Sequence, residues 1–396
     1  MRHNILLFLV FGILTASFSL SDTRAEDVVV HNVTELRQAL NGARAGHVIR
    51  IAPGRYPGGQ SAAGLQGTAD APIRITALDL ADPPVFEGGG NAFHFSSVSH
   101  IVVESLVLSG SQYNGINIDD GGKSDRPSHH VVLKGLTVRD IGSGGNHDGI
   151  KLSGLKDFKV ENCRLSNWGK GGSAIDMVGC HQGEILNCTF FGSEDDAGNG
   201  VQAKGGSSEI RILGCRFDNV GSRGVNLGGS TGLPFFRPID APFEARNIAV
   251  EDCVFLGSPA PIAFVGVDGA KVRHNTIYLP GKYVVRILQE NTNERFVKCR
   301  NGVIERNLII FDPARMGSTT NVGPNTMPET FGYVDNAWFS TDQRGRKPRH
   351  EIREEKGVTD RIPIFVDRDG GDLRQSRDSP TREYGSRADT ALTPSR

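Results

Sequence analysis

A row of polar and charged residues could provide the chemistry of this protein. Each lies between two apolar residues, at the centre of a short segment that recurs along the chain. Alternate side chains of a strand point to opposite faces, so these central residues should point away from the apolar core. In sequence order the seven central residues, polar in all cases except Ala263, are Asn117, Lys151, Asp176, Gln202, Asn226, Ala263 and Arg286.

Further candidates lie beside this row. Lys204 is two residues after Gln202 and should therefore point the same way. Cations, carboxylates and amides together fit an anionic ligand rich in hydroxyl groups, such as a uronate polymer. A solvated sheet face without a ligand is the alternative. The turns before the strands add His147, Asp148, Asn199 and Arg223.

Two loops approach the row. Residues 142–149 form a polar, glycine-rich stretch, and residues 228–238 lie in the longest step of the repeat. Long loops in compact domains are often functional. Phe235 and Phe236 could stack on sugar rings, and Arg237 could bind a carboxylate. Alternatively, the two phenylalanines could only fill a groove.

These residue types meet the requirements of β-elimination at a uronate. The C5 proton becomes acidic only when a cation neutralises the neighbouring carboxylate, and a base must face C5. A lysine can be that base if neighbouring cations lower its pKa. Lys204 is the candidate base, with Arg223, Lys151 or Arg286 as the cation. A glycosidase would instead need two carboxylates across the bond, for which Asp148 and Asp176 are the candidates.

A second repeat in the sequence predicts the strands that position these residues. Apolar, β-rich phrases recur between residues 100 and 310, in steps of 23 to 38 residues. Short β-rich units of this period indicate a solenoid, and no helical pattern separates the strands. The sequence therefore predicts an all-β fold, a right-handed parallel β-helix. Aligning the phrases predicts one inward column: Leu106, Leu136, Cys163, Cys188, Cys215, Cys253, Thr276 and Leu308.

Four of the six cysteines fall in this column. Side chains of neighbouring parallel strands run side by side rather than towards each other, which favours buried free thiols. A disulfide or metal role is the alternative, although the chain contains no CxxC pair.

The ends of the chain predict how the solenoid is bounded. Residues 1–25 have the charged start, apolar stretch and small cleavage-site residues of a signal peptide, which predicts a secreted, periplasmic or extracellular protein. A retained N-terminal anchor is the alternative. Residues 26–60 should form an N-terminal cap, with a short amphipathic helix at 34–40. Residues 61–312 should form the coils, 313–380 a C-terminal cover and 381–396 a disordered tail.

The formal net charge is -1, so no overall field favours nucleic acid or a membrane surface. No other segment is long and apolar enough to span a bilayer after signal cleavage. We therefore expect a polysaccharide, anionic in character, as the partner.

The body of the chain resembles the pectin-lyase-like β-helix superfamily. Residues 199–217 are similar to polysaccharide lyase family 6, which includes chondroitinase B and alginate lyases: Asn199 is followed by Lys204-Gly205-Gly206 and then by Gly214-Cys215-Arg216-Phe217. The resemblance implies that Lys204 is the Brønsted base and that a calcium ion binds near Asn199.

The chain departs from this family at two points. The family has a catalytic arginine inside the next strand, where this chain has Arg223 just before it. The family's calcium site uses several acidic residues, where this chain offers Asn199, Asp195 and Asp196. A lyase is the favoured function; a glycosidase or epimerase, or a non-catalytic glycan-binding or envelope protein, is the alternative.

Overall fold

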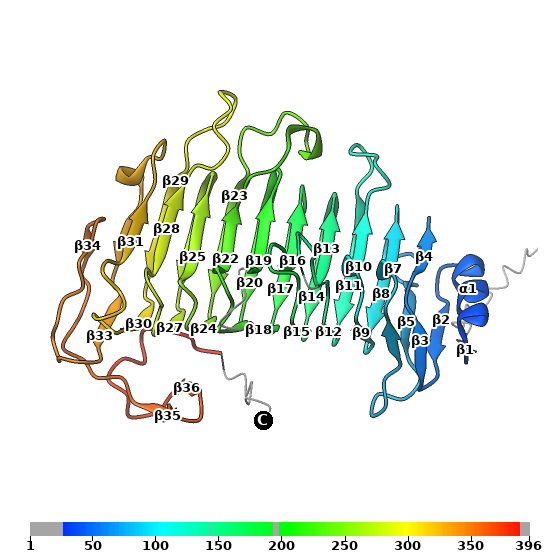
Figure 1. Cartoon of the computed structure of the whole chain (residues 1–396), viewed down its shortest axis with the longest axis horizontal. Coiled ribbons are helices and arrows are strands. Elements are labelled where there is room, and N and C mark those ends of the chain that lie inside the picture. Colours follow the sequence, from blue (N-terminus) through cyan, green and yellow to red (C-terminus); the bar gives the residue numbers. More distant parts are fainter. Residues whose placement is uncertain (1–26, 143, 193–197, 389–396) are drawn as a thin grey trace, which may run out of the picture.

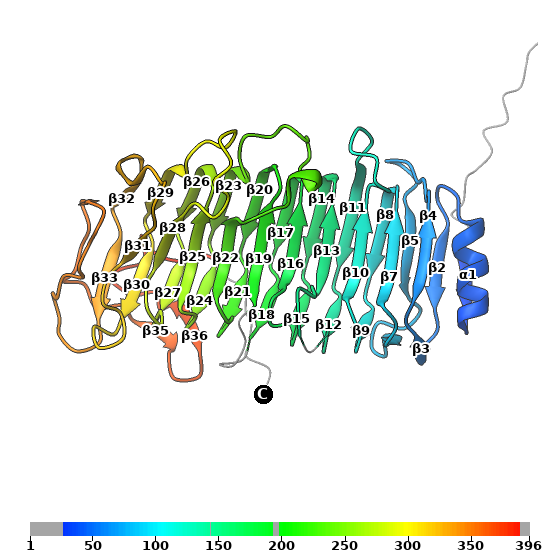
Figure 2. The same ribbon diagram turned by 45° about the horizontal axis from the view of Figure 1, so that its top comes forward.

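The structure, a computed structural model, describes residues 27–142, 144–192 and 198–388. Over these ranges the chain winds into a right-handed parallel β-helix with the shape of a rod (Figure 1 and, turned by 45°, Figure 2). Most coils contribute one strand to each of three parallel sheets, which we name A, B and C. The predicted fold class is confirmed, whereas residues 1–25 lie outside the described residues.

Sheet C carries the predicted polar row. Within the described ranges it has ten strands. They are β4 (Gln60–Ala63), β7 (Asn91–Ser96), β10 (Asn114–Asp119), β13 (Ile150–Ser153), β16 (Ser173–Val178), β19 (Asn199–Lys204), β22 (Arg223–Gly228), β25 (Ala260–Val265), β28 (Val285–Leu288) and β31 (Thr320–Val322).

Sheet A follows sheet C along each coil, and its described part has thirteen strands. They are β1 (Asp27–Val30), β2 (Val48–Ile51), β5 (Ile73–Ala77), β8 (Ser99–Glu104), β11 (Ser128–Lys134), β14 (Leu155–Glu161), β17 (His181–Leu186), β20 (Ser207–Leu213), β23 (Ala245–Glu251), β26 (Val267–Arg273), β29 (Arg300–Glu305), β32 (Gly332–Val334) and β34 (Glu354–Glu355).

Sheet B completes the coil with eleven short strands in the described part of the chain. They are β3 (Arg55–Pro57), β6 (Val85–Glu87), β9 (Val107–Ser109), β12 (Thr137–Arg139), β15 (Arg164–Ser166), β18 (Thr189–Phe191), β21 (Arg216–Asp218), β24 (Val254–Leu256), β27 (Thr276–Tyr278), β30 (Leu308–Phe311) and β33 (Ala337–Ser340).

The turn from sheet A to sheet B has two residues. The first takes a left-handed conformation, as at Asn162 (φ 54°) and Asn187 (φ 52°), which asparagine tolerates better than most residues. The second points inward and forms the predicted column. All six cysteines are free and buried, and four of them lie in this column.

The column differs from the prediction at its C-terminal end. Val254 pairs with Thr276, and Thr276 pairs with Leu308, so these residues belong to the neighbouring column. The inward column continues instead as Asn275, Asn307 and Asn336. Their fully buried amides bond to one another, with Asn275 Nδ2 donating to Asn307 Oδ1 at 2.9 Å and Asn307 Nδ2 to Asn336 Oδ1 at 3.0 Å. The alignment by hydrophobicity failed here because the interior changes from thiols to amides.

A helix closes the N-terminal end of the rod (Figure 1). Helix α1 (Val33–Gly42) packs on β1, β2 and β4 and buries Leu36 and Leu40. Asn32 caps it by accepting the Glu35 N–H at 3.0 Å, and Glu35 accepts the His31 N–H in return. The predicted capping helix is thus confirmed. No helix in the described ranges is long and apolar enough to cross a membrane.

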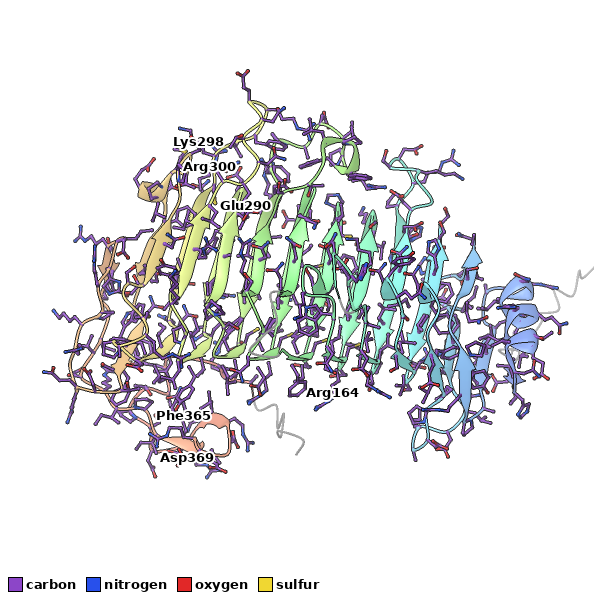
Figure 3. The ribbon with its side chains drawn as sticks, in the orientation of Figure 1. Arg164, Glu290, Lys298, Arg300, Phe365 and Asp369 are labelled. Carbon is purple, nitrogen blue, oxygen red and sulfur yellow. The ribbon has the colours of Figure 1, made fainter. Side chains whose placement is uncertain are left out.

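The C-terminal end differs from the predicted boundaries. Parallel strands continue to Glu355 at the end of β34, beyond the expected end of the coils at residue 312. An antiparallel hairpin, β35 (Phe365–Asp367) and β36 (Asp372–Gln375), then projects from the side of the rod, where Figure 3 labels Phe365 and Asp369. Short helical turns, η1 (Leu233–Phe235) and η2 (Pro328–Thr330), lie in loops.

The predicted disordered tail also needs correction. Residues 381–388 fold back along sheet B, with Thr381 and Tyr384 buried. Arg387 forms an ion pair with Asp252 at 2.9 Å, and the Ser386 hydroxyl donates to the Asp252 carbonyl at 2.7 Å. The polar composition of this segment hid these contacts. Residues 389–396 lie outside the described part.

Candidate functional site

Sheet C places the predicted central residues in a single row. The backbone register pairs Asn117 with Lys151, Lys151 with Asp176, Asp176 with Gln202, Gln202 with Asn226, Asn226 with Ala263, and Ala263 with Arg286. The row extends further than predicted, to Ser61 and His94 at one end and Asn321 at the other. The segment 91–96 has the same apolar-polar-apolar pattern, which could have identified His94.

A groove of about 810 Å3 lies over β10, β13, β16 and β19. Its floor is part of sheet C. Its walls come from the loop after β10 and from the loop after β22, which both rise at the carboxyl ends of the sheet C strands (Figures 1 and 2). Charged and polar side chains dominate the lining, among them Asn117, Asp119, Lys151, Lys204, Thr231 and Arg237.

Two lysines share one buried carboxylate in the floor of the groove. The Lys151 ammonium bonds to Asp176 Oδ2 and lies 3.2 Å from Asp148 Oδ2. Lys204 Nζ lies 3.4 Å from the same Asp176 oxygen and donates to Gln202 Oε1 at 3.3 Å. The Asp176 side chain is 0% exposed, whereas those of Lys151 and Lys204 are 19% and 14% exposed. The lysines therefore present their ammonium groups between the carboxylate and the groove.

The pKa values of Asp148 and Lys151 are both raised, but for different reasons. Burial, together with the charge of Asp176, raises the pKa of Asp148 to about 6. Burial opposes the charged form of Lys151, but the Asp176 and Asp148 carboxylates outweigh it and raise the pKa of Lys151 well above its usual value. Lys151 is consequently a permanent cation near neutral pH.

Arg223 reaches the row from the start of β22. Its Nη1 donates to Asn226 Oδ1 at 2.9 Å, and its Nη2 forms an ion pair at 2.7 Å with Glu290, which follows β28 (Figure 3). Asn226 is the register partner of Gln202, the residue that Lys204 contacts. Lys204 and Arg223 thus extend from opposite ends of neighbouring strands towards adjacent amides of one row.

Arg286 continues this cationic side of the row. Its Nε donates to Asn321 Oδ1 at 3.1 Å. Burial, followed by the charge of Arg223, lowers the pKa of Arg286. The row therefore carries four cations, Lys151, Lys204, Arg223 and Arg286.

The loop after β22 forms one wall of the groove. Arg237 makes a bidentate contact with the buried Asp120 carboxylate, and its Nη2 bonds to Asp120 Oδ1 at 3.1 Å. Phe235 lines the groove and is 62% exposed. Phe236 is 1% exposed and packs on Phe296, so it cannot offer its ring to a ligand. The prediction for Phe236 is therefore corrected, and Phe235 is the available aromatic ring.

A buried glutamate fixes this loop beside Lys204. Glu244 Oε2 accepts the Gly205 N–H at 2.9 Å and the Thr231 hydroxyl at 2.7 Å. Its other oxygen accepts the Thr231 N–H at 2.8 Å and an Asn291 amide N–H at 3.2 Å. Sequence reasoning missed Glu244, because it lies outside both the row and the glycine-rich part of the loop.

The opposite end of the groove holds a second polar cluster that sequence reasoning missed. His94 Nε2 contacts Asp119 Oδ2 at 2.6 Å, and the Ser96 hydroxyl donates to Asp119 Oδ1 at 2.6 Å. Burial opposes ionisation of Asp119, but hydrogen bonds from Ser96, His94 and the Gly121 N–H lower its pKa below the usual value. His147, a predicted ligand contact, packs its ring against Tyr113 beside the groove.

Asn199 does not form a calcium site with the described residues around it. Its register neighbours are Ser173 and Arg223. Calcium takes six to eight oxygen ligands, usually including carboxylates, and an arginine beside it is unfavourable. Asp195 and Asp196, the other predicted ligands, lie outside the described residues.

Comparisons with known proteins agree with this architecture. Residues 91–277 match the family model described as the right-handed beta helix region. A search of curated proteins finds no match. The A-module of a mannuronan C-5 epimerase from Azotobacter vinelandii is similar in structure, with 15% identity and a TM-score of 0.56 over 84% of this chain and 96% of that chain.

Two solved lyases are similar as well. An alginate lyase from Paenibacillus sp. shares 18% identity and a TM-score of 0.52, covering 76% of this chain and 96% of its own. A mannuronic acid specific polysaccharide family 6 lyase from human gut microbiota shares 11% identity and a TM-score of 0.51, covering 81% and 87%. At these identities the likeness shows the fold. This chain is therefore a right-handed parallel β-helix protein with the pectin-lyase-like fold.

Proposed function

We propose that this protein is a lyase that cleaves a uronate-containing polysaccharide by β-elimination in the groove over sheet C. One observation carries the proposal: Lys204 and Lys151 line the groove, with Arg223 directed to the same row from the other side. The groove extends over neighbouring strands from β10 to β19, which suits a polymer. The epimerase and the two lyases named above act on mannuronan, alginate or mannuronic acid, which supports a uronate substrate.

Lys151 and Arg223 are the proposed cations that bind the uronate carboxylate. Lys151 contacts two carboxylates, which keep it protonated, so its role is to neutralise the uronate carboxylate. Arg223 is the second cation available for this purpose. Neutralisation makes the C5 proton acidic enough to be removed.

Lys204 is the proposed base. It lines the groove and contacts one carboxylate, that of Asp176 at 3.4 Å, whereas Lys151 contacts two. The neutral amine takes the C5 proton, the C4–oxygen bond breaks, and a double bond forms between C4 and C5. The departing oxygen takes up a proton, which the Lys204 ammonium can return.

The glycosidase alternative receives less support from the geometry. The Asp148 and Asp176 side chains are 1% and 0% exposed, and both face Lys151. A carboxylic acid must reach the glycosidic oxygen and a second carboxylate must reach the opposite face of the sugar. Neither side chain can reach a sugar in the groove without displacing the lysines.

The test is a screen of the protein, without its first 25 residues, against alginate, polygalacturonate and chondroitin sulfate. The expected result is ultraviolet absorbance from a 4,5-unsaturated uronate that rises together with reducing ends. Reducing ends without absorbance would indicate a glycosidase. Exchange of the C5 hydrogen with deuterated water, without cleavage, would indicate an epimerase, and binding alone a glycan-binding protein. The predicted signal peptide agrees with a polymer met outside the cytoplasm.

A further inference from the structure

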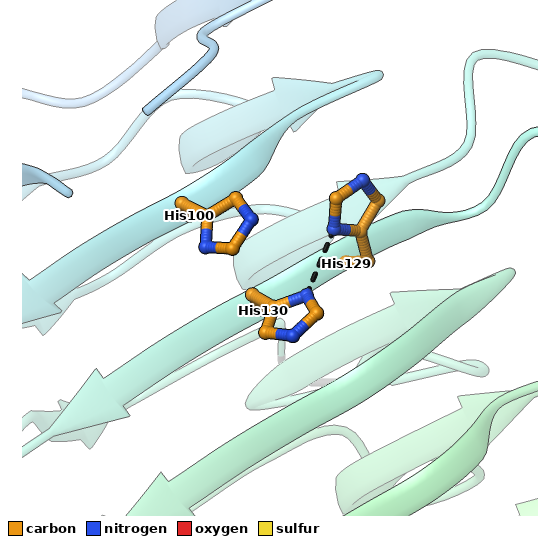
Figure 4. Close-up of side chains that lie close together, drawn as sticks. All are labelled: His100, His129 and His130. Atoms are coloured by element: carbon orange, nitrogen blue, oxygen red, sulfur yellow. Dashed lines mark hydrogen bonds between the residues drawn. The ribbon is translucent and has the colours of Figure 1, made fainter. Parts of the chain in front are cut away.

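Three histidines converge on the outer face of sheet A, away from the groove. His100 comes from β8, and His129 and His130 come from the next strand of the sheet, β11 (Figure 4). One ring nitrogen of each lies within 4.8 Å of the others. His129 Nδ1 and His130 Nδ1 are 2.9 Å apart, and the His100 and His130 rings stack with centroids 4.3 Å apart.

The backbone builds this cluster at an irregularity of the sheet. His100 (φ 49°) and His130 (φ 52°) both take the left-handed conformation and lie opposite each other between regular pairs of β8 and β11. The next member of the same column is Asp157 (φ 51°) on β14. Histidine tolerates this conformation better than most residues, but asparagine and aspartate do so equally well. The conformation therefore does not by itself require histidine at two consecutive levels.

The surroundings leave the three imidazoles available as ligands. A surface hollow of about 460 Å3 adjoins the cluster, and its lining includes His100, His130 and Asp157. Neutral imidazole is the form that binds a metal, and three of them suit zinc, copper or nickel better than calcium or magnesium.

We propose that His100, His129 and His130 bind one divalent transition metal ion. Zinc–imidazole bonds of about 2.0–2.1 Å in a tetrahedral site place ligand nitrogens roughly 3.4 Å apart, so small side-chain rotations close the present arrangement. A water molecule can complete the site as the fourth ligand. The ion would join the coil of β8 to the coil of β11 on a face that the proposed polysaccharide reaction does not use.

The test uses tag-free protein freed of metal by chelation, titrated with Zn²⁺ by calorimetry and with Co²⁺ by visible absorption. We expect one ion per chain, a tetrahedral or five-coordinate Co²⁺ spectrum, and no response to Mg²⁺. His100→Asn and His130→Asn keep a residue that tolerates the left-handed backbone, so they should fold. Each should weaken Zn²⁺ binding at least about tenfold, and the double variant should abolish it.

His31→Asn is the matched control, because His31 lies near helix α1 and outside the cluster. It should leave the titration unchanged. Folding of every variant is checked by circular dichroism. The proposal is overturned if folded wild-type protein binds no stoichiometric Zn²⁺, or if the double variant binds it as tightly as the wild type.

Discussion

Replacing Lys204 by methionine should remove most turnover while leaving the protein folded. A general base typically contributes 10²- to 10⁴-fold to the rate, which corresponds to about 3–5 kcal/mol of transition-state stabilisation. Methionine keeps most of the aliphatic stem and removes only the ammonium group. The initial rate of unsaturated-product formation on a responsive uronate polymer measures the effect.

The structure also changes the expected effect of this substitution on stability. An outward lysine should contribute less than roughly 0.5 kcal/mol. Lys204 is only 14% exposed, and its ammonium lies 3.4 Å from the fully buried Asp176 carboxylate. Losing one partner of a buried ion pair can cost about 3–5 kcal/mol, but Lys151 remains bonded to the same carboxylate. We therefore expect a loss of about 1–2 kcal/mol in the free energy of unfolding, measured with urea.

Arginine variants separate a base from a cation. Arginine keeps the charge but does not give up its proton near neutral pH. Lys204→Arg should therefore remain inactive, whereas Lys151→Arg should retain measurable turnover. Full activity in folded Lys204→Met, or in Lys204→Arg, would refute the assignment of Lys204 as the base.

Three other predictions concern stability. Asn307→Ala removes four hydrogen bonds of the buried amide column and should lower the free energy of unfolding by about 3–4 kcal/mol. Cys215→Ala, in the thiol part of the column, should lower it by about 1–2 kcal/mol. Equal urea midpoints for the two variants would contradict this reasoning. Deleting residues 381–396 should lower the melting temperature by several degrees, because Tyr384 is buried and Arg387 is paired; an unchanged melting curve would mean that these contacts add nothing. Folding raises the pKa of Asp148 to about 6, so the folded state binds more protons than the unfolded state from about pH 4 to about pH 6. The free energy of unfolding should therefore fall as the pH rises through this window. Asp148→Asn should lose this part of the pH dependence.

The repeat could be predicted from sequence because the same alternation of apolar and polar residues returns in every coil. This alternation identified sheet C and the register of its row from Asn117 to Arg286. The buried amides at Asn275 and Asn307 could not be found in this way. A polar residue at an inward position is stable only because its neighbours in the stack satisfy its hydrogen bonds, and a pattern within one coil does not contain that information.

The same limit applies to the groove. The composition of residues 228–238 suggested a ligand-binding loop, but not which ring would be buried. Phe236 packs on Phe296, a residue sixty positions later in the chain, and Arg237 is held by Asp120 from a coil far earlier. Contacts over such separations depend on how the loops fold across the coils, which the repeat does not determine.

The returning C-terminal segment has a consequence for how the rod comes apart. In a solenoid each coil contacts only its neighbours, so the ends can fray one coil at a time. Here the Gly385 N–H bonds to the Arg306 carbonyl at 3.0 Å and Arg387 pairs with Asp252, which joins coils that are not adjacent in sequence. The coils from β23 to β30 should therefore open as one cooperative block, while those nearer helix α1 retain the gradual unfolding of an ordinary solenoid.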